Sequence, residues 1–197
     1  MPLEKICSGH LSSRIFVFVC GTLRVAKLME QPFARVVNRL QKLLEAASVK
    51  LQIRIRIALI GGLAVSAWGA IRATQDIDLL ADSDPSPIGS RPIRDDLQRF
   101  FEAKHCIVEW RVGDSDGPIP LLLRLNLGGA LSQPGADILW AHQRWQQEAL
   151  QRRLEVRSGK LRVFVLHPED LILTKLDAGG RKICSMCKPC SAPGRLT

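Results

Sequence analysis

Residues 57–81, IALIGGLAVSAWGAIRATQDIDLLA, constrain the fold of this chain more than any other segment. An apolar run ends at Gly61-Gly62, a short helical pattern follows, and a second apolar run contains Asp76 and Asp78. Since residues i and i+2 of a strand point to the same face, the two carboxylates are expected to project side by side. Two carboxylates that close repel each other unless a cation lies between them.

A hard divalent cation such as Mg²⁺ suits this pair, because it prefers carboxylate oxygens and keeps coordination sites open for substrate phosphates. The pair therefore indicates phosphoryl or nucleotidyl chemistry rather than a binding module. The alternative is a solvated pair on an exposed edge, which the apolar neighbours disfavour. Gly61 and Gly62, between a strand and a helix, would let backbone N–H groups approach a triphosphate. Without the aspartates, a plain tight turn would be the simpler interpretation.

Periodicity along the rest of the chain predicts further helices and strands. Helices are expected over residues 33–47, 63–68, 93–104, 143–152 and 168–178, and strands over residues 54–60, 76–81, 106–112, 119–127, 135–141 and 161–166. Residues 82–92 are rich in Pro, Ser and Gly and are expected to form a loop.

Three parts of the chain differ in pattern. Residues 1–28 show no clean period and are interpreted as an irregular N-terminal extension, and residues 29–180 as one domain. Residues 181–197 are interpreted as a disordered or aberrant cysteine-rich tail. Its Cys184, Cys187 and Cys190 look like a metal-binding run, but a closed structural site needs four ligands and no fourth cysteine lies at a useful spacing. Cys106 stands alone in a strand-like segment and is expected to be a small buried hydrophobe.

The net charge of +9 invites a nucleic-acid interpretation. Four basic residues and one acidic residue give +3 in residues 1–28, and four basic residues give +4 in residues 178–197. The body between them is nearly balanced, so a nucleic-acid-binding protein is an alternative that composition does not favour. No apolar run approaches the roughly 20 residues that span a bilayer. The protein is expected to be cytoplasmic, with no membrane partner.

One motif resembles the nucleotidyltransferase signature of the DNA polymerase beta superfamily. It consists of Gly61-Gly62, 13 further residues and then Asp76-Ile77-Asp78-Leu79. Within that superfamily, GGLAVSAWGAIRATQDIDLL is similar to bacterial AbiEii-like, MNT-type nucleotidyltransferases found among toxin–antitoxin and abortive-infection proteins. The segments GADILWA and HPEDLILTKLDAGGRK extend the similarity to about residues 33–182. The resemblance implies an α/β (α+β) nucleotidyltransferase fold, with a small mixed twisted sheet flanked by helices.

The resemblance also implies a metal site. Asp76 and Asp78 would hold two divalent ions about 4 Å apart, Mg²⁺ or alternatively Mn²⁺. A third carboxylate usually comes from a neighbouring strand, and Asp137 of GADILWA is the candidate. The alternative for Asp137 is an aspartate that starts a strand or a turn.

The nucleotide would be bound by Gly61, Gly62, Arg72, Thr74 and Lys175, according to the same resemblance. Lys175 would reach the phosphates, where a flexible point charge suits a triphosphate; alternatively it is a surface lysine at the end of an amphipathic helix. Arg72 either contacts phosphate or pairs with one of the aspartates. Thr74 either binds phosphate or simply favours the strand.

The implied reaction is transfer of a nucleoside monophosphate from an NTP to an acceptor hydroxyl, with release of pyrophosphate. The acceptor would be RNA such as tRNA, a protein or a small molecule, and an antitoxin protein is a further expected partner. After Lys182, however, the family's usual aspartate and C-terminal helices are replaced by Ile183 and the cysteine-rich tail. A truncated or inactive relative that acts only through protein contacts is therefore the second interpretation.

Overall fold

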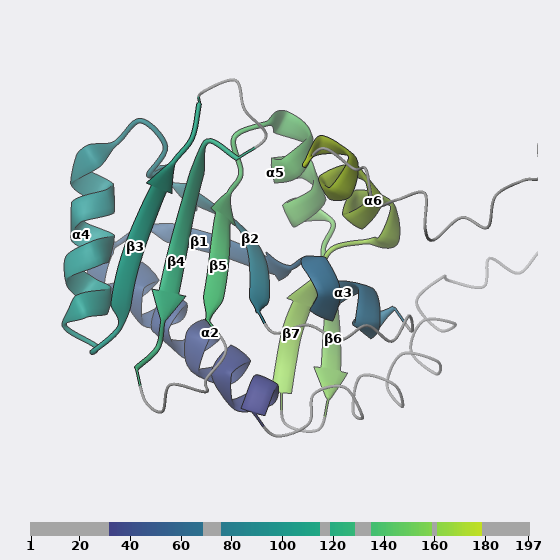
Figure 1. Cartoon of the computed structure of the whole chain (residues 1–197), viewed down its shortest axis with the longest axis horizontal. Helices are drawn as coiled ribbons and strands as arrows, with labels where there is room; N and C mark the ends of the chain where they lie inside the picture. The colour runs from purple at the N-terminus through teal and green to yellow at the C-terminus, as the bar shows by residue number, and fades with distance from the viewer. Residues whose placement is uncertain (1–31, 69–75, 115–118, 129–134, 159–160, 179–197) are drawn as a thin grey trace, which may run out of the picture.

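A seven-stranded mixed sheet organises the computed structural model, which describes residues 32–68, 76–114, 119–128, 135–158 and 161–178. In chain order the elements are α2 Pro32–Leu51, β1 Arg54–Leu59, α3 Gly61–Ala67, β2 Ile77–Asp84, α4 Arg91–Glu102, β3 Ile107–Val112, β4 Leu121–Asn126, β5 Ala136–Trp140, α5 Arg144–Gln151, β6 Leu154–Ser158, β7 Leu161–Val165 and α6 Pro168–Asp177. The predicted α/β fold, a mixed sheet flanked by helices, is confirmed (Figure 1).

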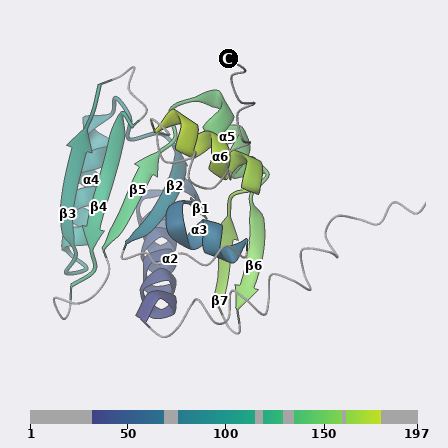
Figure 2. The same cartoon turned by 45° about the vertical axis from the view of Figure 1, so that its right-hand side comes forward.

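The sheet order is β3-β4-β5-β2-β1-β7-β6. Strand β2 is central: it pairs antiparallel with β1 and parallel with β5. Helices α2 and α4 contact each other along the sheet, whereas α3, α5 and α6 gather near β2 and β7 (Figures 1 and 2). The two acidic strands of the predicted site, β2 and β5, are therefore neighbours.

Alternation of apolar side chains explains the core. In β4, Leu121, Leu123 and Leu125 are at most 1% exposed, and in β5 Ala136, Ile138 and Trp140 are at most 2% exposed. The residues between them, Leu122 and Arg124 in β4 and Asp137 and Leu139 in β5, are half-buried, so both strands bury one face fully and the other face only in part. Cys106 is 5% exposed, which confirms its predicted burial.

Two segments differ from their predicted secondary structure over several residues. Residues 82–84 belong to β2 rather than to the predicted loop, because they pair with residues 54–56 of β1, and Asp82 forms an ion pair with Arg56. Strand β6 was not predicted, and it pairs with β7 along its whole length. Most other boundaries lie within a few residues of the prediction. Among the residues that the structure describes, no helix is long and apolar enough to span a membrane.

Candidate active site

A row of polar side chains crosses the sheet at the level of Asp78. Asp78 of β2 is the Cα partner of Asp137 in β5, and Asp137 is the partner of Arg124 in β4. Arg124 is in turn the partner of Glu109 in β3. Paired residues of neighbouring strands place their side chains on the same side of a sheet. The strand register therefore brings two of the three predicted carboxylates, Asp78 and Asp137, side by side.

Gly61 lies directly against the carboxylate of Asp78. A Cβ atom added at Gly61 would stand 2.0 Å from Asp78 Oδ2 and 3.0 Å from its Cβ. Gly61 also has a φ of +62°, a left-handed conformation that side chains disfavour. The neighbouring Ile60 N–H donates a 3.0 Å hydrogen bond to the backbone oxygen of Asp78. Glycine is therefore required here both by the backbone angle and by the space that the carboxylate occupies.

Asp76 lies just before β2 rather than within it, and it is exposed, whereas Asp78 is half-buried in the strand. The prediction that both aspartates project from one strand was therefore wrong for Asp76, which lies in the bend that leads into β2. Asp76 is nevertheless near the polar row, because its charge is among the causes that raise the pKa of Arg124.

Arg124 is a site residue that the sequence reasoning missed. Its Nε donates to Asp137 Oδ1 at 2.7 Å, and its Nη2 donates to Asp137 Oδ2 at 2.6 Å. These hydrogen bonds and the charge of Asp137 raise the pKa of Arg124 above its usual range, with smaller contributions from Glu109 and Asp76. The available signal was a single basic residue in the apolar run LLLRLN.

The carboxylates fit a divalent ion only in part. Asp76 and Asp78 provide the oxygen ligands that Mg²⁺ prefers, and Mg²⁺ is commonly held by one or two carboxylates together with substrate phosphates. Both oxygens of Asp137 accept hydrogen bonds from Arg124. Within the described ranges, no group of three or more His, Cys, Asp or Glu residues is arranged to hold a metal ion. Asp137 is thus engaged by Arg124, and the binding of a metal ion by Asp76 and Asp78 stays a prediction.

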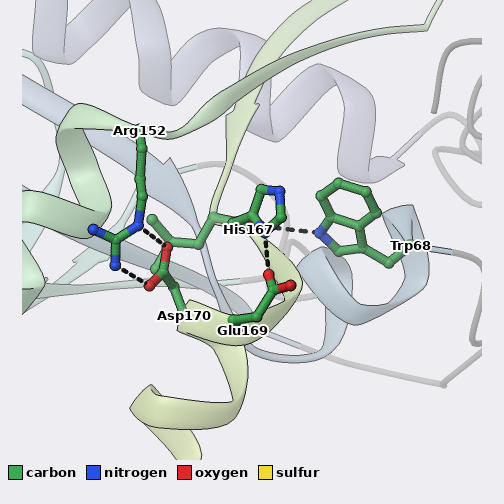
Figure 3. A network of polar contacts seen from close by, with 6 residues as sticks. Trp68, Arg152, His167, Glu169 and Asp170 are labelled. Carbon is green, nitrogen blue, oxygen red and sulfur yellow. Dashed lines mark hydrogen bonds and ion pairs between the residues drawn. The ribbon is translucent and has the colours of Figure 1, made fainter. Parts of the chain in front are cut away.

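Helix α6, which carries Lys175, is fixed in place at its first turn (Figure 3). Asp170 is 1% exposed, and its carboxylate accepts hydrogen bonds from Arg152 Nε at 3.0 Å and from Arg152 Nη2 at 2.5 Å. His167 Nδ1 pairs with the Glu169 carboxylate, and a backbone hydrogen bond and this contact lower the pKa of Glu169. Asp170 thus joins α6 to the end of α5.

Trp68, at the end of α3, also contacts the segment that leads into α6. Its Nε1 donates a 3.0 Å hydrogen bond to the Leu166 carbonyl oxygen, and its ring lies 5.8 Å from that of His167 (Figure 3). Helices α3 and α6 therefore contact each other, and Gly61 and Lys175 belong to adjacent elements.

Lys175 itself is half-buried, and its ammonium group forms no hydrogen bond or ion pair with the described residues. Gly62 is buried in the first turn of α3, next to Gly61. Arg72 and Thr74 lie outside the described residues, as do Cys184, Cys187, Cys190 and the segments 1–28 and 181–197. The roles of these residues and the three-part division of the chain stay predictions.

No family model matches the sequence, and no curated protein matches it. The solved structures that share part of its arrangement include an antigenic nucleotidyltransferase-like protein from Paracoccidioides brasiliensis, with 19% identity and a TM-score of 0.46 over 75% of this chain and 66% of that chain. ANT(2")-Ia, solved in complex with adenylyl-2"-tobramycin, has 20% identity and a TM-score of 0.43 over 81% of this chain and 82% of that chain. Terminal uridylyl transferase 4 from Trypanosoma brucei, solved with UTP and UMP, has 17% identity and a TM-score of 0.36.

The present chain spans just under two thirds of the Paracoccidioides protein, at 66%, and 40% of the Trypanosoma enzyme. These likenesses concern only the arrangement of the chain.

Proposed function

We propose that this protein is a metal-dependent nucleotidyltransferase. The observation that carries the proposal is the contact between Gly61 and Asp78, together with the pairing of Asp78 with Asp137 in the next strand. Because Gly61 has no Cβ, the backbone at the start of α3 can lie directly against the Asp78 carboxylate, so that a phosphate chain could meet backbone N–H groups and that carboxylate together. Such an arrangement suits the transfer of a phosphorus-containing group better than it suits a plain structural turn.

In the proposed reaction, the oxygen of an acceptor hydroxyl attacks the α-phosphorus of an NTP. The bond between the α-phosphorus and the oxygen that bridges it to the β-phosphate breaks, and pyrophosphate leaves. Asp76 and Asp78 would hold Mg²⁺ or Mn²⁺, which when bound would neutralise charge on the phosphates and on the leaving group. The backbone at Gly61 and Gly62 would lie along the phosphates, and Lys175, carried by the helix next to α3, would reach them.

Asp137 would act on the acceptor side of the site, because β5 lies on the side of β2 away from β1 and Gly61. The candidate acceptors are RNA, a protein or a small hydroxylated molecule. A cytoplasmic role as one component of a toxin–antitoxin pair, with an antitoxin protein as partner, follows from the sequence resemblance and belongs to the proposal.

The test is label transfer from each α-³²P NTP with Mg²⁺, using total RNA, the protein itself and small hydroxylated molecules as acceptors. The Asp76→Asn/Asp78→Asn variant removes the two charges with little change in volume. Asp95→Asn is the matched control, since Asp95 is exposed on α4 and its carboxylate lies 3.9 Å from Arg91 Nε. Label transfer by the natural protein and by Asp95→Asn, but not by the double variant, supports the proposal. Transfer that survives in the double variant contradicts it.

A second candidate is an inactive relative that acts only through protein contacts. The observation in its favour is the outer surface of α6, where Ile172, Leu173 and Leu176 are 54%, 43% and 55% exposed. Apolar side chains grouped on one helix are a feature of interaction surfaces. A folded protein that binds no NTP in the presence of Mg²⁺ would favour this candidate.

A further inference from the structure

A cavity lies where strands β1 and β7 separate. These parallel strands share one Cα pair, Leu59 with Val165, whereas β1 pairs with β2 along all six of its residues. Away from that pair, a cavity of about 300 Å³ opens between α2 and the two strands. The cavity is lined by Gln41, Leu44, Glu45, Ser48, Val49, Ile55, Ile57, Arg153 and Phe164. Its size is at the lower end of the range found for small-molecule sites.

Of the lining residues in the described part of the chain, Arg153 is the only cation. Its Nη1 donates to the Leu150 carbonyl oxygen at 2.7 Å, and its guanidinium carbon lies 4.3 Å from the centre of the Phe164 ring. Its Nε is buried without a hydrogen-bond partner. Among the described residues, Arg153 has no carboxylate partner. One carbonyl and one aromatic ring therefore leave most of the donor capacity of this half-buried guanidinium unused.

The charges around Arg153 destabilise the charged form of its guanidinium. Burial lowers the pKa of Arg153, and the charges of Arg56 and Arg54 lower it further. Arg56 is itself paired with Asp82, whereas the charges that act on the pKa of Arg153 are those of two cations. A half-buried cation without a counter-ion destabilises a fold unless an anion approaches it. The arrangement is therefore that of a site whose anion comes from outside the chain.

We propose that this cavity binds a small organic carboxylate with an apolar body. The carboxylate would accept hydrogen bonds from the Arg153 guanidinium, whose planar donors match carboxylate geometry. The hydrocarbon part would lie among the apolar lining residues Leu44, Ile55, Ile57 and Phe164. Glu45 also lines the cavity, so a phosphate dianion would meet a like charge there. The chemistry of the lining thus favours an apolar monoacid over inorganic phosphate.

This site is separate from the proposed active site. Ile57, which lines the cavity, is the strand partner of Ala81, and Ala81 lies three residues along β2 from Asp78, about 10 Å at the usual rise of a strand. The proposal does not depend on nucleotidyl transfer, and its test needs no NTP.

The probe is phenylacetate, added to the full-length protein while the midpoint of thermal unfolding is measured. At about ten times its dissociation constant, a ligand of the folded state should raise the midpoint by about 3–5 °C. Phenylacetamide, which has the same body without the charge, should give no shift. Inorganic phosphate is tested in the same way. If phosphate raised the unfolding midpoint as much as phenylacetate does, and if this shift also depended on Arg153, the assignment of an organic acid would be overturned.

Two variants test the assignment to this cavity. Arg153→Met keeps a long side chain against Phe164 and removes the charge, so the phenylacetate shift should disappear while the ligand-free protein is no less stable. Val49→Trp should block the cavity from an exposed position, since Val49 is 80% exposed. Arg162→Met, at an exposed position on β7 outside the lining, is the charge-matched control and should keep the shift.

An equal shift in Arg153→Met and in the natural protein would overturn the proposal. A natural protein that does not respond to phenylacetate would overturn it as well. A ligand-free Arg153→Met that unfolds several degrees below the natural protein would show instead that Arg153 is a structural residue.

Discussion

Arg124 holds both carboxylate oxygens of Asp137, at 2.7 and 2.6 Å, and Asp137 is the strand partner of Asp78. The guanidinium therefore stands next to the pair of strands that carries the proposed metal site. A divalent ion that used Asp137 as a ligand would have to displace two charge-assisted hydrogen bonds. The state of this ion pair sets how many carboxylates are available to bind a metal ion.

Arg124→Gln should therefore strengthen the binding of divalent ions. The variant releases Asp137 and removes a positive charge. At about 6 Å, the repulsion between that charge and a divalent ion is about 1.4 kcal/mol even at the dielectric constant of water. The expected effect is a dissociation constant for Mn²⁺ about tenfold lower, measured by electron paramagnetic resonance of free Mn²⁺.

The control for this variant is Arg111→Gln. Arg111 pairs with Glu109 at 2.9 Å on the neighbouring strand β3, so the same charge is removed without changing the partner of Asp137. Unchanged Mn²⁺ affinity in Arg124→Gln, or an equal gain in both variants, would contradict a specific competition for Asp137. Absence of Mn²⁺ binding in every protein would instead contradict the proposed function.

Gly61→Ala should damage the site more than it damages the fold. The new Cβ would lie 2.0 Å from Asp78 Oδ2, so the carboxylate must move. A displacement of about 1 Å at a reacting centre can lower activity about 100-fold. Gly89→Ala provides the comparison, because Gly89 has a φ of +72° and no atom within 4 Å of its added Cβ.

Both alanine variants should lose about 1–2 kcal/mol from backbone strain, measured by urea unfolding. Only Gly61→Ala should lose label transfer. Equal activity in the two variants would mean that the position of the Asp78 carboxylate does not matter for the reaction.

Arg152→Met should destabilise the fold by leaving the buried Asp170 carboxylate without its partner. Because the Arg152 side chain is 50% exposed and water can partly replace it, the expected loss is about 1–3 kcal/mol in urea unfolding. The double variant Arg152→Met/Asp170→Leu removes both charges and should be more stable than Arg152→Met alone. A double variant that is less stable than Arg152→Met would show that the ion pair is not the reason for the loss.

Cys106 should make stability fall at alkaline pH. Burial raises the pKa of its thiol, although the charge of Arg39 lowers it slightly. The unfolded chain then releases the thiol proton at lower pH than the folded chain does. The contribution of this group to stability is complete below the ordinary thiol pKa and is lost as the pH rises through the higher folded value.

Cys106→Ala should therefore remove part of the decline in unfolding free energy above about pH 8.5, the ordinary thiol value. The natural protein and the variant are compared by urea unfolding across the alkaline range. A constant difference in unfolding free energy below that range would reflect the packing lost in the variant. Parallel curves throughout the alkaline range would contradict the prediction.

Sequence patterns predicted the elements that alternate strongly. The apolar runs around Gly61, Asp78 and Asp137 became α3, β2 and β5 because each run matches the period of its element. Strand β6 was missed because LEVRS is short and polar, and its pairing with β7 depends on residues that follow it in the chain. The strand character of residues 82–84 likewise comes from their partners in β1.

The sequence indicated the aspartates of the candidate site but not the arginine that pairs with one of them. Asp76, Asp78 and Asp137 were identified from their spacing and from the family resemblance, and the register of β2 with β5 brings the last two together. Arg124 could not be assigned from the sequence, because its partner is set by the pairing of β4 with β5. Arg153 was missed for a similar reason, since its lack of a counter-ion is visible only after the chain is folded.

The most direct test of the central claim is the Mn²⁺-dependent binding of an NTP, which needs no knowledge of the acceptor. The measurement is isothermal titration with an NTP that cannot be cleaved at the α–β bond, with and without Mn²⁺, for the natural protein, Asp78→Asn and Asp95→Asn. We predict metal-dependent binding by the natural protein and by Asp95→Asn, and its loss in Asp78→Asn. Binding by Asp78→Asn with the same affinity and the same dependence on Mn²⁺ would contradict the account.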